Sequence, residues 1–220
     1  MATVSNTKIL MKLTTVIESD KKIQDFLSKM ETHSLETFSH SLQVGVLTTA
    51  FLMANPTFCN QSSDMDKIIT ASLLHDVGKL NIPVEVLEKK EPLTEKEWEI
   101  IRKHPRLGEK ALEEKGFGKD IRNLVLFHHS TSTHKKGYPP TYFFVRSNPE
   151  IMKYIEIVSL CDIYSAIVQP RKYKSPKTKE YALEEIRKEN YDIEILVAFK
   201  DMVNKMGDIF IGNFMDMIRG

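Results

Sequence analysis

Apolar residues recur at helical spacing along nearly all of this 220-residue chain, and this periodicity limits the possible folds more than any other feature. Strand-like alternation between paired turn residues is hard to find. The pattern predicts helices over residues 8–30, about 35–54, 64–77, from about 95, 120–130, 150–168, 178–189 and from 193. We therefore predict an all-α fold, a helical bundle.

The expected ends of these helices carry recognisable signals. Thr94 and Glu97 have the spacing of a capping box, and Asp192 is placed to cap the last helix. Gly78 follows an apolar helix and is predicted to end it. Pro105 is expected to kink or split the helix that starts near Glu95.

The domain organisation follows from length and composition. A chain of 220 residues is long enough to bury a full core. It has neither an internal repeat nor a Ser/Gly-rich linker. We predict one helical domain over residues 31–220, with residues 1–30 forming an N-terminal helical extension packed on it.

Charge and cysteine content exclude several classes of protein. The formal net charge is +1, so no bulk charge favours DNA or an anionic membrane. Two cysteines cannot build a disulfide framework or a cysteine-only zinc site. The sequence shows no signal peptide pattern and no apolar run long enough to span a membrane. We therefore expect a cytoplasmic protein with no DNA partner and no membrane insertion.

Two pairs of adjacent polar residues follow apolar helices. His75-Asp76 comes after residues 68–74, and His128-His129 comes after residues 124–127. A buried His-Asp pair needs a partner. A metal ion can use both the imidazole nitrogen and the carboxylate oxygens. Hydrogen bonding within the fold would also satisfy either pair, so the pairs alone leave both interpretations open.

Longer motifs resemble a known family. His75 to Leu112 reads HDVGKLNIPVEVLEKKEPLTEKEWEIIRKHPRLGEKAL, which closely resembles the HD-GYP family of metal-dependent phosphodiesterases, a branch of the HD phosphohydrolases. The similarity is carried further, in order, by FSHSLQV (38–44), VLFHH (125–129), GYP (137–139), IVSLCDIYSAI (157–167), RKYK (171–174) and YDIEILVAF (191–199).

The resemblance implies a dinuclear metal site. Two divalent ions, iron or manganese, would be bound, with Asp76 bridging them. The implied ligands are His40, His75, Asp76, His104, His128, His129 and Asp162. Glu36 lies four residues before His40, so it is either a ligand of a third metal or an ordinary surface residue. Ser165 stands where the family usually has an aspartate, which favours two metals.

The resemblance also implies hydrolysis of a cyclic dinucleotide, with cyclic di-GMP converted to linear pGpG, GMP or both. Asp76 and Lys79 would be catalytic, and Lys79 would contact the phosphate. The implied substrate-binding residues are Lys79, Gly137, Tyr138, Pro139, Arg171 and Lys174. A signalling protein partner is a further expectation, since family members often accompany sensor or receiver domains.

The sequence departs from the family in one loop. Ser130 and Thr131 replace the usual Glu-Arg, and the Asp-Gly before Gly-Tyr-Pro is absent. Two other functions therefore stay open: a catalytically weak or inactive module that binds nucleotide or a protein, and an HD phosphohydrolase acting on mononucleotides. Outside the motifs, we expect Trp98 to anchor its helix in the core and His33 to face solvent.

Overall fold

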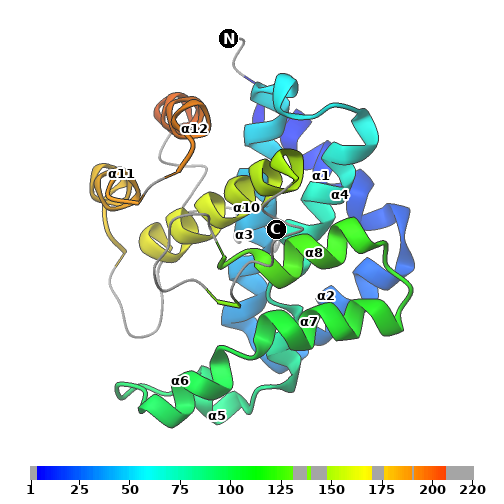
Figure 1. Cartoon of the computed structure of the whole chain (residues 1–220), viewed down its shortest axis with the longest axis vertical. Helices are drawn as coiled ribbons and strands as arrows, with labels where there is room; N and C mark the ends of the chain where they lie inside the picture. Colours follow the sequence, from blue (N-terminus) through cyan, green and yellow to red (C-terminus); the bar gives the residue numbers. More distant parts are fainter. Residues whose placement is uncertain (1–3, 131–137, 140–147, 170–175, 190, 207–220) are drawn as a thin grey trace.

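The computed structural model describes residues 4–130, 138–139, 148–169, 176–189 and 191–206, which form helices without a strand among them (Figure 1). The predicted all-α fold is confirmed. The helices are α1 (Asn6–Ser19), α2 (Lys21–His33), α3 (Leu35–Ala54), α4 (Ser62–Leu74), α5 (Val84–Leu87), α6 (Glu95–Ile101), α7 (His104–Glu114), α8 (Lys119–Phe127), α10 (Pro149–Val168), α11 (Lys179–Arg187) and α12 (Ile193–Lys205), with short 3₁₀ helices η1 (Pro56–Phe58) and η2 (Val77–Asn81).

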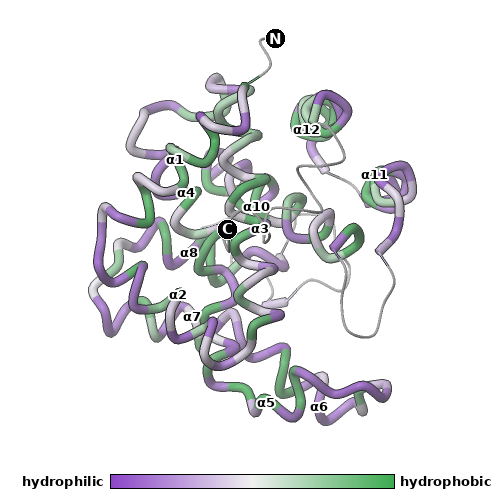
Figure 2. The backbone as a smooth tube through the Cα atoms, turned by 180° about the vertical axis from the view of Figure 1, so that it is seen from behind, coloured by the Kyte–Doolittle hydropathy of each residue, from purple (hydrophilic) through white to green (hydrophobic). Residues whose placement is uncertain are grey.

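Helices α3 and α10 form the centre of the molecule. Both are 20 residues long and apolar on most sides, which is the pattern of a helix surrounded by others. Helices α1, α2, α4, α10 and α12 all contact α3. Figure 2 shows apolar residues gathered along these central helices and polar residues on the outer ones. The two central helices therefore give the site a rigid wall.

The N-terminal segment consists of two helices where the periodicity predicted one. Asp20 has extended backbone angles and separates α1 from α2. Its carboxylate accepts a hydrogen bond from the backbone nitrogen of Lys22 at 2.9 Å, so it caps α2. Both helices pack against α3. Periodicity missed the break because the apolar spacing continues across it.

Most predicted helix ends agree with the structure. Thr94 and Glu97 form the capping box of α6, and Asp192 accepts hydrogen bonds from the first turn of α12. Pro105 lies in the first turn of α7, so the predicted split is confirmed. The predicted start of α4 was wrong by two residues, because Gln61 is the N-cap residue and forms a capping box with Asp64.

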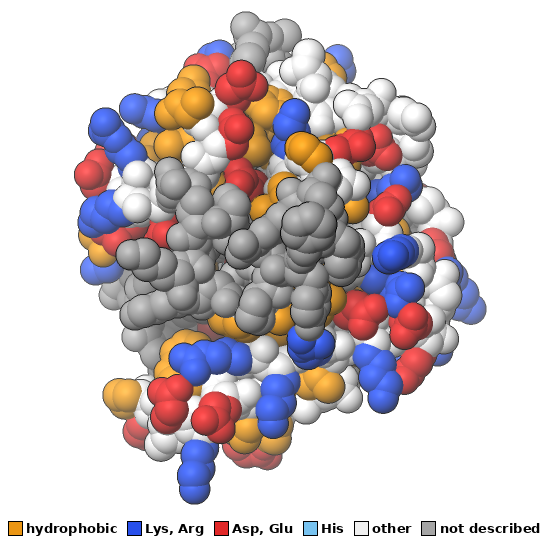
Figure 3. All heavy atoms as spheres, in the orientation of Figure 1, with side chains coloured by type: hydrophobic (Ala, Val, Ile, Leu, Met, Phe, Trp, Pro, Cys, Tyr) orange, Lys and Arg blue, Asp and Glu red, His pale blue; other side chains and the backbone are white. Residues whose placement is uncertain are grey.

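The remaining helices lie at the periphery. Helices α5 and α6 project at one end, and α11 and α12 lie on one flank (Figure 1). Figure 3 shows acidic and basic side chains interspersed over the described part of the visible face. Within the described ranges, no helix has both the length and the apolar character needed to cross a membrane.

Candidate metal centre

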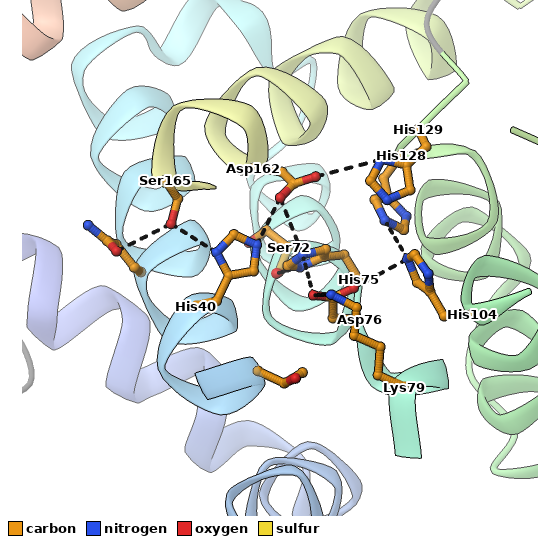
Figure 4. A network of polar contacts seen from close by, with 12 residues as sticks. His40, Ser72, His75, Asp76, Lys79, His104, His128, His129, Asp162 and Ser165 are labelled. Carbon is orange, nitrogen blue, oxygen red and sulfur yellow. Dashed lines mark hydrogen bonds and ion pairs between the residues drawn. The ribbon is translucent and has the colours of Figure 1, made fainter. Parts of the chain in front are cut away.

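The structure brings all seven predicted metal ligands together between α3, α4, α7, α8 and α10 (Figure 4). Three groups of three side chains have ligand atoms within 4.8 Å of one another. The groups are His104, His128 and His129; His40, His75 and Asp76; and His75, His128 and Asp162. All of these residues are buried except His129, which is partly exposed.

Helix ends allow adjacent residues to face the same space. His75 is the C-cap residue of α4, and Asp76 then turns the chain into η2. His128 is likewise the C-cap residue of α8, directly before His129. Neighbouring side chains on a regular helix diverge by about 100°. Where the helix stops, both members of a pair can reach one centre.

Gly78 brings η2 against α7. A Cβ atom at this position would overlap the carbonyl oxygen of His104 and lie 2.5 Å from the backbone nitrogen of Gly108. Gly78 is therefore needed for close approach, whereas the sequence predicted it as a helix-ending residue. Because the two elements touch here, Nε2 of His104 lies 3.3 Å from Oδ1 of Asp76.

Three histidines are oriented by backbone carbonyl groups. The Nδ1 atoms of His75, His104 and His128 lie 2.8, 2.8 and 2.7 Å from the carbonyl oxygens of residues 72, 101 and 125. A carbonyl oxygen only accepts, so each Nδ1 carries the hydrogen. When such a ring is neutral, it presents the lone pair of Nε2 to the centre.

This arrangement fits a bound cation. The Nε2 atoms of His104 and His128 lie 3.3 Å apart, so two lone pairs face each other. Nε2 of His75 is buried and has no hydrogen bond within the described part of the chain, and it lies 3.4 Å from Oδ2 of Asp76. Adding a proton is unfavourable, since burial lowers the pKa of His104 to about 3 and that of His128 well below its usual value. A divalent metal satisfies these nitrogens without protonating them.

His40 is oriented by side chains instead. Its Nδ1 lies 3.1 Å from the hydroxyl of Ser165, which itself donates to Oε1 of Gln43 at 3.2 Å. Nε2 lies 2.8 Å from Oδ1 of Asp162. With Nε2 bound to a cation, Nδ1 would carry the hydrogen and donate it to the Ser165 hydroxyl. Sequence analysis missed this role for Ser165 and Gln43. Their spacing was a usable signal, since Gln43 is three residues after His40 and Ser165 three after Asp162.

Both carboxylates of the centre are held ionised. Burial by itself would raise the pKa of Asp76, but Lys79 and His75 outweigh it and hold the pKa well below its usual range. Burial acts in the same way on Asp162, where His40 and His75 lower the pKa. Burial lowers the pKa of His129 to about 4. At neutral pH the centre therefore offers anionic carboxylates and, at the four histidines whose pKa is lowered, neutral imidazoles, the forms that bind metal. The pKa of His75 is raised instead, because the neighbouring carboxylates outweigh its burial.

Three of the six predicted substrate-binding positions, Lys79, Tyr138 and Pro139, lie in the described part of the chain. Nζ of Lys79 lies 2.6 Å from Oδ2 of Asp76. The ring of Tyr138 lies beside that of His129, with 4.7 Å between centroids. Pro139 is held by Ser130, whose hydroxyl donates to the Pro139 carbonyl. The other predicted positions, Gly137, Arg171 and Lys174, lie outside the described residues.

Glu36 and Trp98 line a cavity next to the centre. Glu36 belongs to none of the three groups of ligand atoms found among the described residues. Trp98 is 42% exposed, so the prediction of a core anchor was wrong. None of the residues of its helix is buried, and the indole borders the cavity. His33, predicted to face solvent, is partly buried, and its Nε2 lies 2.9 Å from the carbonyl oxygen of Ile82.

Fold and site together define an all-α protein with a buried His/Asp cluster able to bind divalent metal. Comparison with protein-family models identifies the family, because the HD domain model matches residues 37–167, more than half of the sequence. The chain belongs to the HD domain family, which confirms the family predicted from the sequence.

Several curated relatives are similar in sequence. Cyclic di-GMP phosphodiesterase PA4108 of Pseudomonas aeruginosa is 27% identical over 79% of this chain and 41% of its own length. Cyclic di-GMP phosphodiesterase PdeB of Borreliella burgdorferi is 32% identical over 61% of this chain and 34% of its own. The 3'3'-cGAMP-specific phosphodiesterase 2 of Vibrio cholerae is 28% identical over 76% of this chain and 31% of its own length. The chain thus spans less than two thirds of these relatives.

Solved structures support the fold. The HD domain of the phosphodiesterase PgpH of L. monocytogenes, in complex with cyclic-di-AMP, matches with a TM-score of 0.58 and 20% identity. The match covers 81% of this chain and 93% of that chain. The similarity extends over nearly the whole PgpH domain, so the arrangement of helices is shared.

Proposed function

We propose that this protein is a metal-dependent phosphodiesterase that hydrolyses a cyclic dinucleotide, with cyclic di-GMP converted to linear pGpG, GMP or both. The convergence of seven ligand side chains beside Lys79 carries the proposal. The names of the relatives support this substrate class, since they are cyclic di-GMP or 3'3'-cGAMP phosphodiesterases. The fit of the cluster to cations supports the metal dependence.

The proposed cofactor is a pair of divalent ions, iron or manganese. One ion would be held by His40, His75, Asp76 and Asp162. The other would be held by His104, His128 and His129 together with Asp76. A mixed set of imidazoles and carboxylates suits these metals better than structural zinc. A role for Glu36 in a third site stays a prediction.

The protein's own groups would position the substrate and stabilise charge. Two divalent cations, when bound, lower the pKa of a water molecule and neutralise the phosphodiester anion. The ammonium of Lys79 lies 2.6 Å from Asp76, so it can stabilise negative charge on the non-bridging phosphate oxygens beside the cluster. The backbone carbonyls behind His75, His104 and His128 keep their Nε2 atoms directed at the centre.

The remaining assignments concern the substrate pocket and the chain as a whole. Tyr138 adjoins His129, and both Tyr138 and Pro139 would border the substrate. Gly137, Arg171 and Lys174 would bind the rest of the dinucleotide, as the resemblance implies. The proposal also includes an N-terminal helical extension formed by residues 1–30. It further includes a signalling protein as partner and a location in the cytoplasm.

An anaerobic assay tests the function directly. The protein would be loaded with Fe(II) or Mn(II), its bound metal quantified, and its products from cyclic di-GMP, 3'3'-cGAMP and cyclic di-AMP separated by chromatography. We expect about two metals per chain and a linear product from cyclic di-GMP. Binding of cyclic di-GMP without turnover would instead identify a binding module.

Asp76→Ala is the decisive variant. It removes the carboxylate shared by both proposed ion sites, so we expect loss of bound metal and a fall in turnover below detection, while the helical circular dichroism signal stays. Asp120→Ala, which removes a surface carboxylate paired with Lys67, is the matched control and should keep both metal and activity. Turnover that persists in Asp76→Ala would reject the two-metal mechanism.

A further inference from the structure

We propose that the cavity between α3, η2 and α6 binds a purine base, preferably guanine, stacked on the indole of Trp98. This inference rests on the proposed function for its placement, because the phosphate attached to that nucleoside would lie at the metal centre. It assigns a base-binding role to Trp98 and Glu36, and for Glu36 this role would replace the predicted third-metal site.

The cavity adjoins the metal centre. His40 and Lys79 line one part of it, and both also contact the carboxylates of the cluster. Leu87, Leu93 and Trp98 line another part. Its volume is about 200 Å³, below the roughly 300–1,000 Å³ of sites that enclose a drug-sized ligand. The space therefore suits one base rather than a whole dinucleotide.

Trp98 is placed as a stacking surface. The guanidinium carbon of Arg102 lies 5.9 Å from the centroid of the indole. The indole is nevertheless 42% exposed, so apolar area stays in contact with water and a base can cover it. Helix α6, which carries Trp98, begins with a capping box, and Lys89 is paired with Glu97 at 2.7 Å. These contacts stabilise the helix that carries the indole. Stacking on an aromatic side chain accepts any base, so it supplies affinity rather than selectivity.

Glu36 supplies the selectivity. It is the one carboxylate among the described residues that line the cavity. An ionised carboxylate only accepts hydrogen bonds. Guanine presents two neighbouring N–H donors, at N1 and N2, to such a group. Adenine presents an unprotonated N1 there, which a carboxylate repels. The cavity should thus prefer guanine to adenine.

The intrinsic fluorescence of the protein provides a direct test, because Trp98 is the only tryptophan in the chain. The metal-loaded protein would be titrated with GMP, AMP and ribose 5-phosphate. We expect saturable quenching by GMP, weaker binding of AMP, and no comparable quenching by ribose 5-phosphate, which lacks a base. Equal responses to GMP and ribose 5-phosphate would overturn the proposal.

Calorimetry on variants provides the second test. Removing the stacking surface in Trp98→Ala should weaken GMP binding about 5- to 150-fold, whereas Trp98→Phe should keep most of the affinity. Tyr181→Ala, which truncates a similarly exposed aromatic side chain on α11, is the matched control and should bind GMP normally. Glu36→Gln should reduce the preference for GMP over AMP. Metal content and circular dichroism confirm that each variant is folded.

The two proposals can fail separately. Hydrolysis of cyclic di-GMP combined with unaltered GMP binding in Trp98→Ala would reject the base site and leave the phosphodiesterase intact. GMP binding that depends on Trp98, without hydrolysis of any cyclic dinucleotide, would support the base site and reject the proposed activity.

Discussion

Among single residues, His75, His104 and His128 share one arrangement. In each case Nδ1 bonds the carbonyl oxygen three residues earlier, in the last turn of a helix. Such carbonyls have no partner within their helix. The imidazole therefore satisfies an orphan acceptor and is oriented by it at the same time. His40 lies within α3, where no such carbonyl is available, and depends on Ser165 instead.

Ser165→Ala tests that dependence. Loss of the hydroxyl removes the acceptor for His40 Nδ1, so the ring can rotate or change tautomer, and we expect metal affinity to fall about 10- to 100-fold. Competition with a chelator of known affinity would measure this. Ser159→Ala, on the same helix, breaks a bond to Tyr191 and should leave metal affinity unchanged. Equal affinities in both variants would assign Ser165 to packing alone.

Among the secondary structure elements, the contact between η2 and α7 decides the geometry of the centre. His104 and Asp76 are 28 positions apart in sequence numbering, and they meet because Gly78 lets the two elements touch. Gly108 sits opposite and is also tightly packed. The capped helices around this contact keep η2 and α7 rigid.

Gly78→Ala should separate these elements. The added methyl group overlaps backbone atoms that cannot rotate away, so we expect a loss of roughly 3 kcal/mol in the free energy of unfolding, or roughly 6–12 °C in Tm. Metal occupancy should fall as well, since His104 moves away from Asp76. Calorimetry and metal analysis would measure both effects.

Gly118→Ala is the control for this substitution. A Cβ atom at Gly118 meets nothing within 4 Å, although alanine is a poorer N-cap residue for α8. The Gly118→Ala substitution should lower the free energy of unfolding by at most about 1 kcal/mol, and the variant should still bind the metal. A Gly78→Ala protein as stable as the Gly118 variant would show that the close contact is dispensable.

For the whole molecule, packing of the bundle around the centre shifts the pKa values of the histidines that it contains. Burial lowers the pKa of His40, His104, His128 and His129, whereas in His75 the nearby carboxylates outweigh burial and raise it. The unfolded chain therefore binds more protons than the folded chain below about pH 6.5. Stability should fall as the pH is lowered through this range, with His75 opposing the trend.

Thermal unfolding of the chelator-treated protein between pH 7 and pH 5 would measure the effect. We expect Tm to decrease steadily with pH, since each buried neutral histidine costs roughly 1.4 kcal/mol per pH unit below about 6. Asp76 and Asp162 do not contribute between pH 5 and pH 7, because they titrate at lower pH in both the folded and the unfolded chain. A His104→Gln variant should show a shallower slope. A Tm that stays constant or rises on acidification would contradict the assignment of neutral histidines.

The sequence alone determined the all-α class, most helix ends and the set of candidate ligands. Periodicity reports which side of a helix is apolar, and capping residues act within a few positions of their own helix, so both can be read locally. The seven ligand positions were found because their order and spacing resemble a family. Trp98 was misassigned because its helix lies at the edge of the bundle, which no local pattern records.

Only the tertiary structure decided how these residues act together. The approach of η2 to α7, the orientation of His40 by Ser165, and the cavity beside Trp98 all join segments far apart in the chain. Their geometry depends on which helix covers which apolar face and at what distance. That information arises from packing between elements, so it is absent from the pattern of any single segment.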